Sequence, residues 1–402
     1  MAEVTNYIDR LVAELCPDGV EYRPLGSLGK RNKGTAITAS KMRSLEPGNK
    51  DLRIFAAGST FVDTDSSNIP AKDILHGPAI IVKSRGYIGF EYYEKSFTHK
   101  NEMWSYTLDG SIVDQKFIYY YLLTQAYYLQ ELARSKSVKL PQLSVKDTDS
   151  LEVPVPPMEI QEAIVEILDK FTNMEAELEA ELEARTLQYE YYRDSLFEAL
   201  DCPRVPLGSL GTFVRGNGLQ KKDLQESGNP VIHYGQVFTR YGLYEDKTLS
   251  YANEGVYNKL RKAEKGNLVI ATTSENDEDV CKALAWLGET PAGISGDAYI
   301  YRHEMNPKYV SYFFTTHDFQ RQKLRHITGT KVRRVSGKNL ETIEIPLPSL
   351  EEQQRIVDIL DRFDALTSSL SEGLPAELAA RRSQYEYYRD QLLAFPRKGE
   401  NQ

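Results

Sequence analysis

The sequence predicts an α+β protein in which two similar α/β domains are separated by two long antiparallel helices, in a pseudo-twofold internal repeat. The word Gln-Tyr-Glu-Tyr-Tyr-Arg-Asp occurs at 188–194 and again at 384–390, in a chain of 402 residues. A second word, Pro-Leu-Gly-Ser-Leu-Gly, is identical at 24–29 and 206–211. A repeat of this length predicts two copies of one domain, because solenoids repeat about every 20–50 residues.

The repeated words divide the chain into six parts. We expect an N-terminal helix at 1–22, a first variable domain at 23–156, a central helical region at 157–204, a second variable domain at 205–348, a C-terminal helical region at 349–395 and a tail at 396–402. Each variable domain has a short β-like run, at 79–82 and 267–270, followed by an aromatic helix at 117–122 and 309–314. Such mixed segments between turn residues indicate a compact α+β domain.

Both helical regions carry apolar side chains at alternating steps of three and four, which predicts a helix that packs on another long helix. The pattern runs from Ile164 to Leu196 and from Leu374 to Phe395. Gly373 and Pro375 follow one additional step of four, so we expect a break or kink there. The side chains expected to serve helix packing or partner docking are Leu178, Leu182, Tyr189, Tyr192, Leu378, Tyr385 and Tyr388.

The net charge of −9 is unevenly distributed. Residues 157–200 carry −9 and residues 349–395 carry −4, which leaves +4 on the rest of the chain. The average charge therefore does not exclude nucleic acid as a partner of the variable domains. No apolar stretch is long enough to span a bilayer, and no basic start precedes an apolar run, so we expect a cytoplasmic protein without a signal peptide.

Motifs for catalysis are not found in the sequence. Gly337-Lys338 is followed by Asn339, so the Ser or Thr of a phosphate-binding loop is missing. The run 306–309 lacks the second proline that is typical of an adenine methyltransferase. Three cysteines and six histidines have no metal-ligand spacing. We therefore expect a chain that is not an enzyme and holds no metal or cofactor.

Basic side chains interleaved with aromatic ones in the variable domains favour binding to double-stranded DNA. Lys and Arg can hold phosphates, while Arg and Gln can read base edges. Two basic loops, at 136–142 and 329–334, recur at the same place in the repeat. The candidates for DNA contact are Lys83, Arg85, Lys136, Lys139, Gln142, Arg215, Lys221, Gln236, Arg240, Lys331, Arg333 and Arg334.

Three alternatives stay open at this point. Each basic side chain can simply be a solvated surface charge. The two domains can be a protein-interaction scaffold on a helical spacer, which would bind partners independently of salt and would not protect DNA. The chain can also be an enzyme itself, which would transfer methyl groups or cleave DNA without a partner.

The segments 351–361 (Glu-Glu-Gln-Gln-Arg-Ile-Val-Asp-Ile-Leu-Asp, after a Pro-x-Pro) and 385–390 resemble the specificity subunit of type I restriction-modification systems. The resemblance covers the whole chain. It implies that each variable domain is a target-recognition domain that reads one half of a split, asymmetric DNA site. It also implies that the helices fix the half-site spacing, which a four-residue repeat such as 176–179 and 180–183 would tune.

The same resemblance implies partners. Two methyltransferase (modification) subunits would dock on the helices and carry S-adenosylmethionine, and a restriction (motor-nuclease) subunit, where present, would use ATP and Mg. No membrane is implied. The family supplies no base-contact residues, because its reading surfaces vary.

Overall fold

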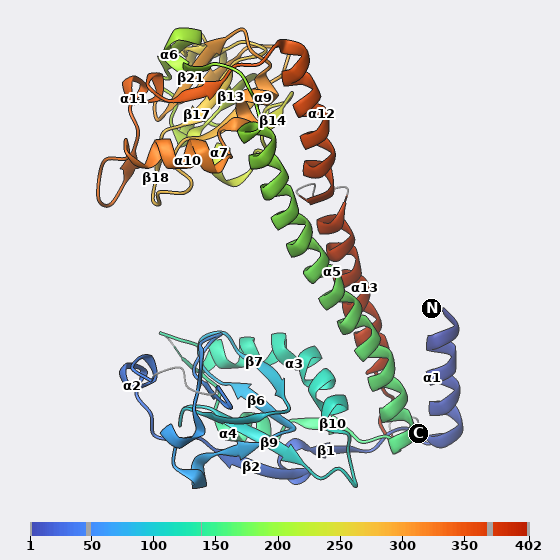
Figure 1. The fold of residues 1–402 in the computed structure, drawn as a ribbon. Coiled ribbons are helices and arrows are strands. Elements are labelled where there is room, and N and C mark those ends of the chain that lie inside the picture. The colour runs from blue at the N-terminus through green and yellow to red at the C-terminus, as the bar shows by residue number, and fades with distance from the viewer. Residues whose placement is uncertain (1, 46–49, 138, 368–372, 400–402) are drawn as a thin grey trace. The chain divides into compact units, whose positions relative to one another are not determined.

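The computed structural model describes residues 2–45, 50–137, 139–367 and 373–399. The chain forms two compact units, Met1–Glu177 with Leu378–Gln402 and Leu178–Glu377 (Figure 1). Each unit combines one variable domain with parts of both helical regions. The mixed helices and sheets of each variable domain, with a long helical region following each in the chain, confirm the predicted fold class.

The first unit is built from α1 (Ala2–Leu15), β1 (Tyr22–Pro24), β2 (Gly29–Lys33), α2 (Ala39–Arg43), β3 (Leu52–Phe55), β4 (Phe61–Thr64), β5 (Leu75–His76), β6 (Ala79–Lys83), β7 (Gly89–Tyr93), β8 (Ser96–His99), β9 (Trp104–Leu108), α3 (Gln115–Lys136), α4 (Val145–Asp149) and β10 (Glu152–Pro154). Its strands form sheets in the orders β2-β9-β6-β7, β4-β3-β8-β5 and β1-β10. The first part of α5 (Met158–Glu198) and most of α13 (Leu374–Leu392) complete this unit.

The second unit is built from the rest of α5, β11 (Arg204–Pro206), α6 (Leu207–Leu210), β12 (Gly211–Arg215), β13 (Asn229–Ile232), α7 (Tyr234–Thr239), β14 (Tyr244–Glu245), β15 (Ser250–Ala252), α8 (Glu254–Tyr257), β16 (Lys262–Ala263), β17 (Leu268–Ala271), β18 (Thr273–Ser274), β19 (Lys282–Trp286), β20 (Ala292–Ile294), β21 (Ala298–His303), α9 (Pro307–Phe313), α10 (His317–Leu324), β22 (Arg333–Arg334), α11 (Gly337–Glu341), β23 (Glu344–Pro346) and α12 (Leu350–Thr367). Its sheets have the orders β12-β21-β17-β19-β14, β15-β13-β20-β16, β18-β22 and β11-β23.

The predicted strands at 79–82 and 267–270 are β6 and β17, which are inner strands of a four-stranded sheet in the first unit and of the five-stranded sheet in the second. Their residues alternate between two apolar clusters, so both faces of the strand are covered. Leu268 and Ile270 pack with α9, whereas Val269 and Ala271 pack with Val237 of α7. A strand that is buried on both faces has a continuous apolar sequence, which explains why these two runs were visible in the sequence.

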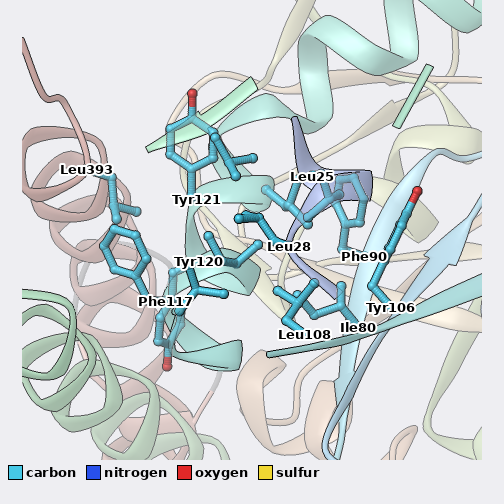
Figure 2. Packing of buried hydrophobic residues seen from close by; sticks show 14 of the residues in the cluster. Leu25, Leu28, Ile80, Phe90, Tyr106, Leu108, Phe117, Tyr120, Tyr121 and Leu393 are labelled. Carbon is cyan, nitrogen blue, oxygen red and sulfur yellow. The ribbon is translucent and has the colours of Figure 1, made fainter. Parts of the chain in front are cut away.

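The aromatic helix of the first unit, α3, packs against β6 and β7 (Figure 1). Asp114 begins this helix, and its carboxylate accepts hydrogen bonds from the backbone N–H groups of Lys116 and Phe117 at 2.7 and 2.9 Å. Figure 2 shows side chains of α3 between the strands and Leu393. The apolar core of the domain therefore extends through α3 to the C-terminal segment of the chain.

One carboxylate in each unit ties a long helix to its variable domain. Asp169 on α5 accepts hydrogen bonds from Lys116 Nζ at 2.7 Å and from the Tyr120 hydroxyl at 2.5 Å. Asp361 on α12 accepts from Lys308 Nζ and the Tyr312 hydroxyl, both at 2.7 Å. These contacts connect residues about fifty positions apart in both halves, so the duplication is preserved in the hydrogen bonds as well as in the sequence.

A buried glutamine lies in the first turn of α5 and of α12 and makes the same bonds in both. Gln161 donates to the carbonyl of Pro156 at 2.7 Å and accepts from the Asp114 N–H at 2.8 Å. Gln353 repeats both bonds, with Pro348 at 2.9 Å and with the Asn306 N–H at 2.9 Å. These repeated glutamines therefore have a structural role, because they satisfy backbone groups that would otherwise be buried without a partner.

Each copy of the repeated seven-residue word packs on the long helix of the other half. In the first unit Phe171 of α5 stacks on Tyr388, with ring centroids 5.8 Å apart, and also contacts Tyr385. In the second unit Phe363 of α12 stacks on Tyr192 at 5.6 Å and contacts Tyr189. Two tyrosines of each copy therefore make equivalent aromatic contacts in the two units.

The helices of the first unit run antiparallel. Phe171 contacts Tyr385, whereas Glu175, one turn further along α5, pairs with Arg382, which lies earlier on α13. Among the other residues proposed for helix packing, Leu378 is buried, while Leu178 and Leu182 are partly exposed.

The structure differs from the expected division of the chain at the N-terminal helix and at the C-terminal tail. The N-terminal helix ends at Leu15, well before residue 22. Pro17 has no N–H to continue the helix, and Gly19 takes a φ of +89°, which favours glycine. Val20 then pairs with the segment predicted as a tail, since its N–H donates to Pro396 and its carbonyl accepts from Lys398.

The expected break in the second helical region is present. Helix α12 ends at Thr367 and α13 begins at Leu374, after Gly373 with a φ of +81°. Residues 368–372, which carry part of the additional step of four, lie outside the described residues. Val138, in the first basic loop, also lies outside the described residues.

Candidate nucleic-acid interface

Two loops of the first domain bring together three of the predicted DNA-contact residues. The Gly86 N–H donates to Pro141 O, and the Leu143 N–H donates to Ser84 O, both at 2.9 Å. Arg85 and Gln142 therefore lie opposite each other in a short antiparallel bridge. Both side chains are exposed, as is that of Lys139 on the same loop. We call residues 84–86 and 139–143 the first loop pair.

Two other candidates of the first domain are held in ion pairs within that domain. Lys83 Nζ lies 2.7 Å from the carboxylate of Glu91 on β7. Lys136, at the end of α3, pairs with Asp147 of α4. Because their charges are already partly compensated, these lysines are weaker candidates for DNA contact than Arg85 and Lys139.

The second domain has the equivalent arrangement. Strand β18 pairs with β22, so Thr273 lies opposite Arg334, and the Val335 N–H donates to Thr272 O at 3.3 Å. The bridge Arg85–Gln142 thus corresponds to Thr273–Arg334, and by the same register Lys139 corresponds to Lys331. We call residues 272–274 and 331–335 the second loop pair.

The two arginines of the second loop pair have different surroundings. Arg333 Nε lies 2.8 Å from Asp277, and its Nη1 donates to the Gly329 carbonyl at 2.6 Å. Arg334 is exposed and, with Arg215, lines a hollow of about 250 Å³. Asp297 lies in the same hollow, 3.6 Å from an Arg215 guanidinium nitrogen. The hollow therefore offers two guanidinium groups and one carboxylate to a ligand.

The remaining candidates of the second domain lie at different places. Lys221 is exposed at the start of the short turn Lys221–Asp223. Arg240 is exposed at the end of α7. Gln236 donates to the Ser250 hydroxyl at 2.7 Å and accepts from the His233 N–H at 3.4 Å. Its amide therefore stabilises the turn into α7, which makes Gln236 a weaker candidate for reading a base.

The sequence did not single out the two carboxylates of these surfaces, Asp297 and its counterpart Glu102. Lys100 Nζ lies 2.6 Å from Glu102. Although burial raises the pKa of Glu102, its hydrogen bond with Lys100 and the nearby Arg85 charge lower it overall. A single acidic residue in a variable segment has no periodicity or spacing that would reveal it. By contrast, Asp169 and Asp361 recur within the repeated helical blocks and could have been found there.

Other kinds of site are not evident in the residues that the structure describes. Within 2–45, 50–137, 139–367 and 373–399, no three His, Cys, Asp or Glu side chains are grouped so that they could hold a metal ion. The three cysteines are free, and burial raises the pKa of Cys281 to about 12. Over the same ranges, no helix is long and apolar enough to cross a membrane.

Comparison with known proteins decides the family. The model of the type I restriction modification DNA specificity domain matches twice, at residues 17–185 and 203–380. The EcoR124I/EcoR124II specificity subunit of Escherichia coli is 30% identical over 417 residues, covering 98% of both chains. The chain belongs to the type I restriction-modification specificity family. A Haemophilus influenzae chain named as a type I restriction enzyme specificity subunit is 28% identical and covers 70% of this chain and 73% of its own length.

Solved structures from type I restriction-modification systems share the fold. The S subunit of the type I system of M. genitalium aligns with a TM-score of 0.54 at 17% identity, covering 93% of this chain and 96% of that one. A chain from a study of complex assembly in the type I R-M system aligns with a TM-score of 0.59 at 12% identity, covering 93% and 97%. Membership of the specificity family does not favour the interaction scaffold that the sequence left open.

Proposed function

We propose that this chain is the DNA specificity subunit of a type I restriction-modification complex, and that each variable domain reads one half of a split, asymmetric site. The proposal rests on the first and second loop pairs. Their backbone bonds are equivalent, yet Arg85 and Gln142 in one correspond to Thr273 and Arg334 in the other. Two equivalent backbone arrangements that carry different side chains are suited to reading two different half-sites, because base edges are distinguished by their donor and acceptor pattern.

The long helices would set the distance between the half-sites. Helix α5 has 41 residues, which corresponds to a rise of about 60 Å at 1.5 Å per residue. The hydrogen bonds of Asp169 and Asp361 fix each variable domain to its helix, so a change in helix length would move a domain as a whole. The exposed Tyr191 and Tyr387, with 70% and 61% of their surface accessible, leave apolar area for partner subunits.

The partners are two methyltransferase subunits, which would carry S-adenosylmethionine, with or without restriction subunits that use ATP and Mg. The specificity chain itself would be non-catalytic, would hold no cofactor and would act in the cytoplasm. In this assignment the acidic helical regions serve the protein partners, and the basic loop pairs serve the DNA.

The test is the genome-wide pattern of adenine methylation in cells that express this chain with its modification subunit. The wild-type chain is expected to give one split motif, and exchange of residues 205–348 should change only one half of it. If no motif appears although the complex assembles, or if the exchange alters both halves, the proposal is wrong. The double variant Arg333→Ala, Arg334→Ala should impair one half-site only.

A further inference from the structure

The structure places a carboxylate and a basic side chain at matching positions in both domains, next to the loop pairs. In the first domain β2 and β9 pair Lys33 with Trp104, and in the second β12 and β21 pair Arg215 with Tyr299. Lys33 and Arg215 are therefore equivalent. Two residues before Trp104 lies Glu102, and two residues before Tyr299 lies Asp297, so these carboxylates are equivalent as well.

The backbone at each carboxylate is held by the same kind of contact. The Ser84 hydroxyl donates to the Glu102 carbonyl at 2.6 Å. At the corresponding position the Thr272 N–H donates to the Asp297 carbonyl at 3.1 Å. These bonds connect the carboxylate position directly to the loop pair. Only the carbonyl groups take part in these bonds, so the carboxylate groups keep partners of their own, Lys100 for Glu102 and Arg215 for Asp297.

In the second domain Arg215, Thr273, Asp297 and Arg334 line one hollow, and the equivalent positions of the first domain are Lys33, Arg85, Glu102 and Gln142. Two positions keep their chemistry, with Lys33 and Arg215 as cations and Glu102 and Asp297 as anions. The other two change, with Arg85 and Gln142 in the first domain and Thr273 and Arg334 in the second. At the bridge itself the arginine is therefore on the first segment in one domain, at Arg85, and on the second segment in the other, at Arg334, whereas the carboxylate keeps its position.

A carboxylate at this place is informative about the ligand. A phosphate site is built from cations and N–H groups, and Asp297 or Glu102 would repel the phosphate charge. A base pair presents both kinds of partner, because the cytosine amino group donates to Asp or Glu, and guanine O6 and N7 accept from Arg or Lys. Glutamine suits adenine, which presents a donor and an acceptor side by side.

We infer that these four positions are the base-reading centre of each domain: Lys33, Arg85, Glu102 and Gln142 in the first, and Arg215, Thr273, Asp297 and Arg334 in the second. This inference rests on the proposed function and adds to it which residues read bases. Asp297 accepts from a cytosine and Arg334 donates to a guanine in the second half-site. Glu102 and Gln142 take the corresponding roles in the first, with Gln142 directed at an adenine.

The experiment compares methylation motifs of the assembled complex for wild type and for single variants. Asp297→Asn should relax one G·C position of the second half-site, lowering discrimination there by roughly tenfold to a hundredfold, the usual value of one base contact. The first half-site should stay unchanged. Glu102→Gln should give the reverse result. Arg334→Gln places in the second domain the residue that the first domain has, so preference at one position should move from guanine towards adenine.

Asp246→Asn is the matched control, because Asp246 is an exposed carboxylate of the second domain that lines a different hollow. It should leave the motif unchanged. If Asp297→Asn and Arg334→Gln keep the wild-type motif, or lower methylation equally at all sequences, the base-reading assignment is overturned while the proposed function stands. If wild type itself gives no split motif, the proposed function fails instead. If the Asp297→Asn chain does not form the complex, Glu102→Gln and Arg334→Gln still test the base-reading assignment.

Discussion

Replacement of Asp361 by alanine tests whether the contact between α12 and the second domain holds that unit together. The carboxylate accepts hydrogen bonds from Lys308 Nζ and from the Tyr312 hydroxyl, both at 2.7 Å. Tyr312 is fully buried, so the substitution leaves its hydroxyl without this partner. Burial and the bond to Asp361 together raise the pKa of Tyr312, so the hydroxyl stays protonated and available as a donor.

The magnitude follows from these two partners. An unsatisfied buried hydroxyl costs about 1–3 kcal/mol. The Lys308 pair is partly exposed, with side-chain accessibilities of 23% and 30%, so solvent screening limits its contribution to about 0–1 kcal/mol. Lys308 also keeps its position 3.5 Å from the centre of the Tyr244 ring. We therefore expect Asp361→Ala to lower the free energy of unfolding of the second unit by about 2–3 kcal/mol.

The assay is calorimetric unfolding of the chain, in which a loss of this size lowers the melting temperature of a unit this large by about 4–12 °C. Asp358→Ala is the control, because Asp358 lies on the same helix but is exposed and contacts only Gln354 among the hydrogen bonds described for it. The double variant with Tyr312→Phe should lose less than the sum of the single losses, because it leaves no unpaired hydroxyl. Equal melting of Asp361→Ala and Asp358→Ala, or strict additivity, would refute this reasoning.

Three further outcomes are expected. Deletion of 180–183 removes about one helical turn, roughly 6 Å of rise, so methylation mapping should find the same half-sites at a shorter preferred spacing; an unchanged spacing would contradict the role of α5 as a spacer. Burial lowers the pKa of His99 to about 4, so below pH 6.5 the unfolded chain takes up a proton that the folded chain does not, and stability falls. Chemical denaturation should show about 2 kcal/mol less stability of the first unit at pH 5 than at pH 7. His99→Gln should remove that difference in the first unit, and an unchanged pH dependence there would count against it; His303, whose pKa burial also lowers to about 4, contributes to the second unit. Phe171→Ala removes the stack on Tyr388 and should lower the free energy of unfolding of the first unit by about 2–3 kcal/mol in thermal unfolding. Met174 is exposed, so Met174→Ala should lower it by less than about 0.5 kcal/mol. Equal losses for the two variants would argue against the stack.

The local patterns of the sequence determined the architecture. The 3–4 spacing defined α5 and α13, the continuous apolar runs defined β6 and β17, and the identical words defined the duplication and pointed to the family. These features are visible because helix periodicity, strand burial and repetition are recorded in residues close together in the chain. The glycine at 373 likewise marked a break in the second helical region before the structure placed one between α12 and α13.

Only the tertiary structure decided what the polar side chains do. Gln236, a candidate for reading a base, has its amide engaged with Ser250, and Lys83 and Lys136 are paired with carboxylates. Asp297, which no sequence pattern marked, lies beside Arg215. The role of a charged or amide group depends on which partners the fold brings within about 3 Å, and those partners lie on other elements of the chain.

The same limit applies to the repeated word. Its sequence showed that the helices pack, but not that each copy packs on the helix of the other half, because the partner of an apolar seam is set by the path of the chain between the helices. The duplication, the helices and the family were therefore determined by the sequence alone. Many basic residues were candidates from the sequence. Only the fold shows which of them share a surface with a carboxylate.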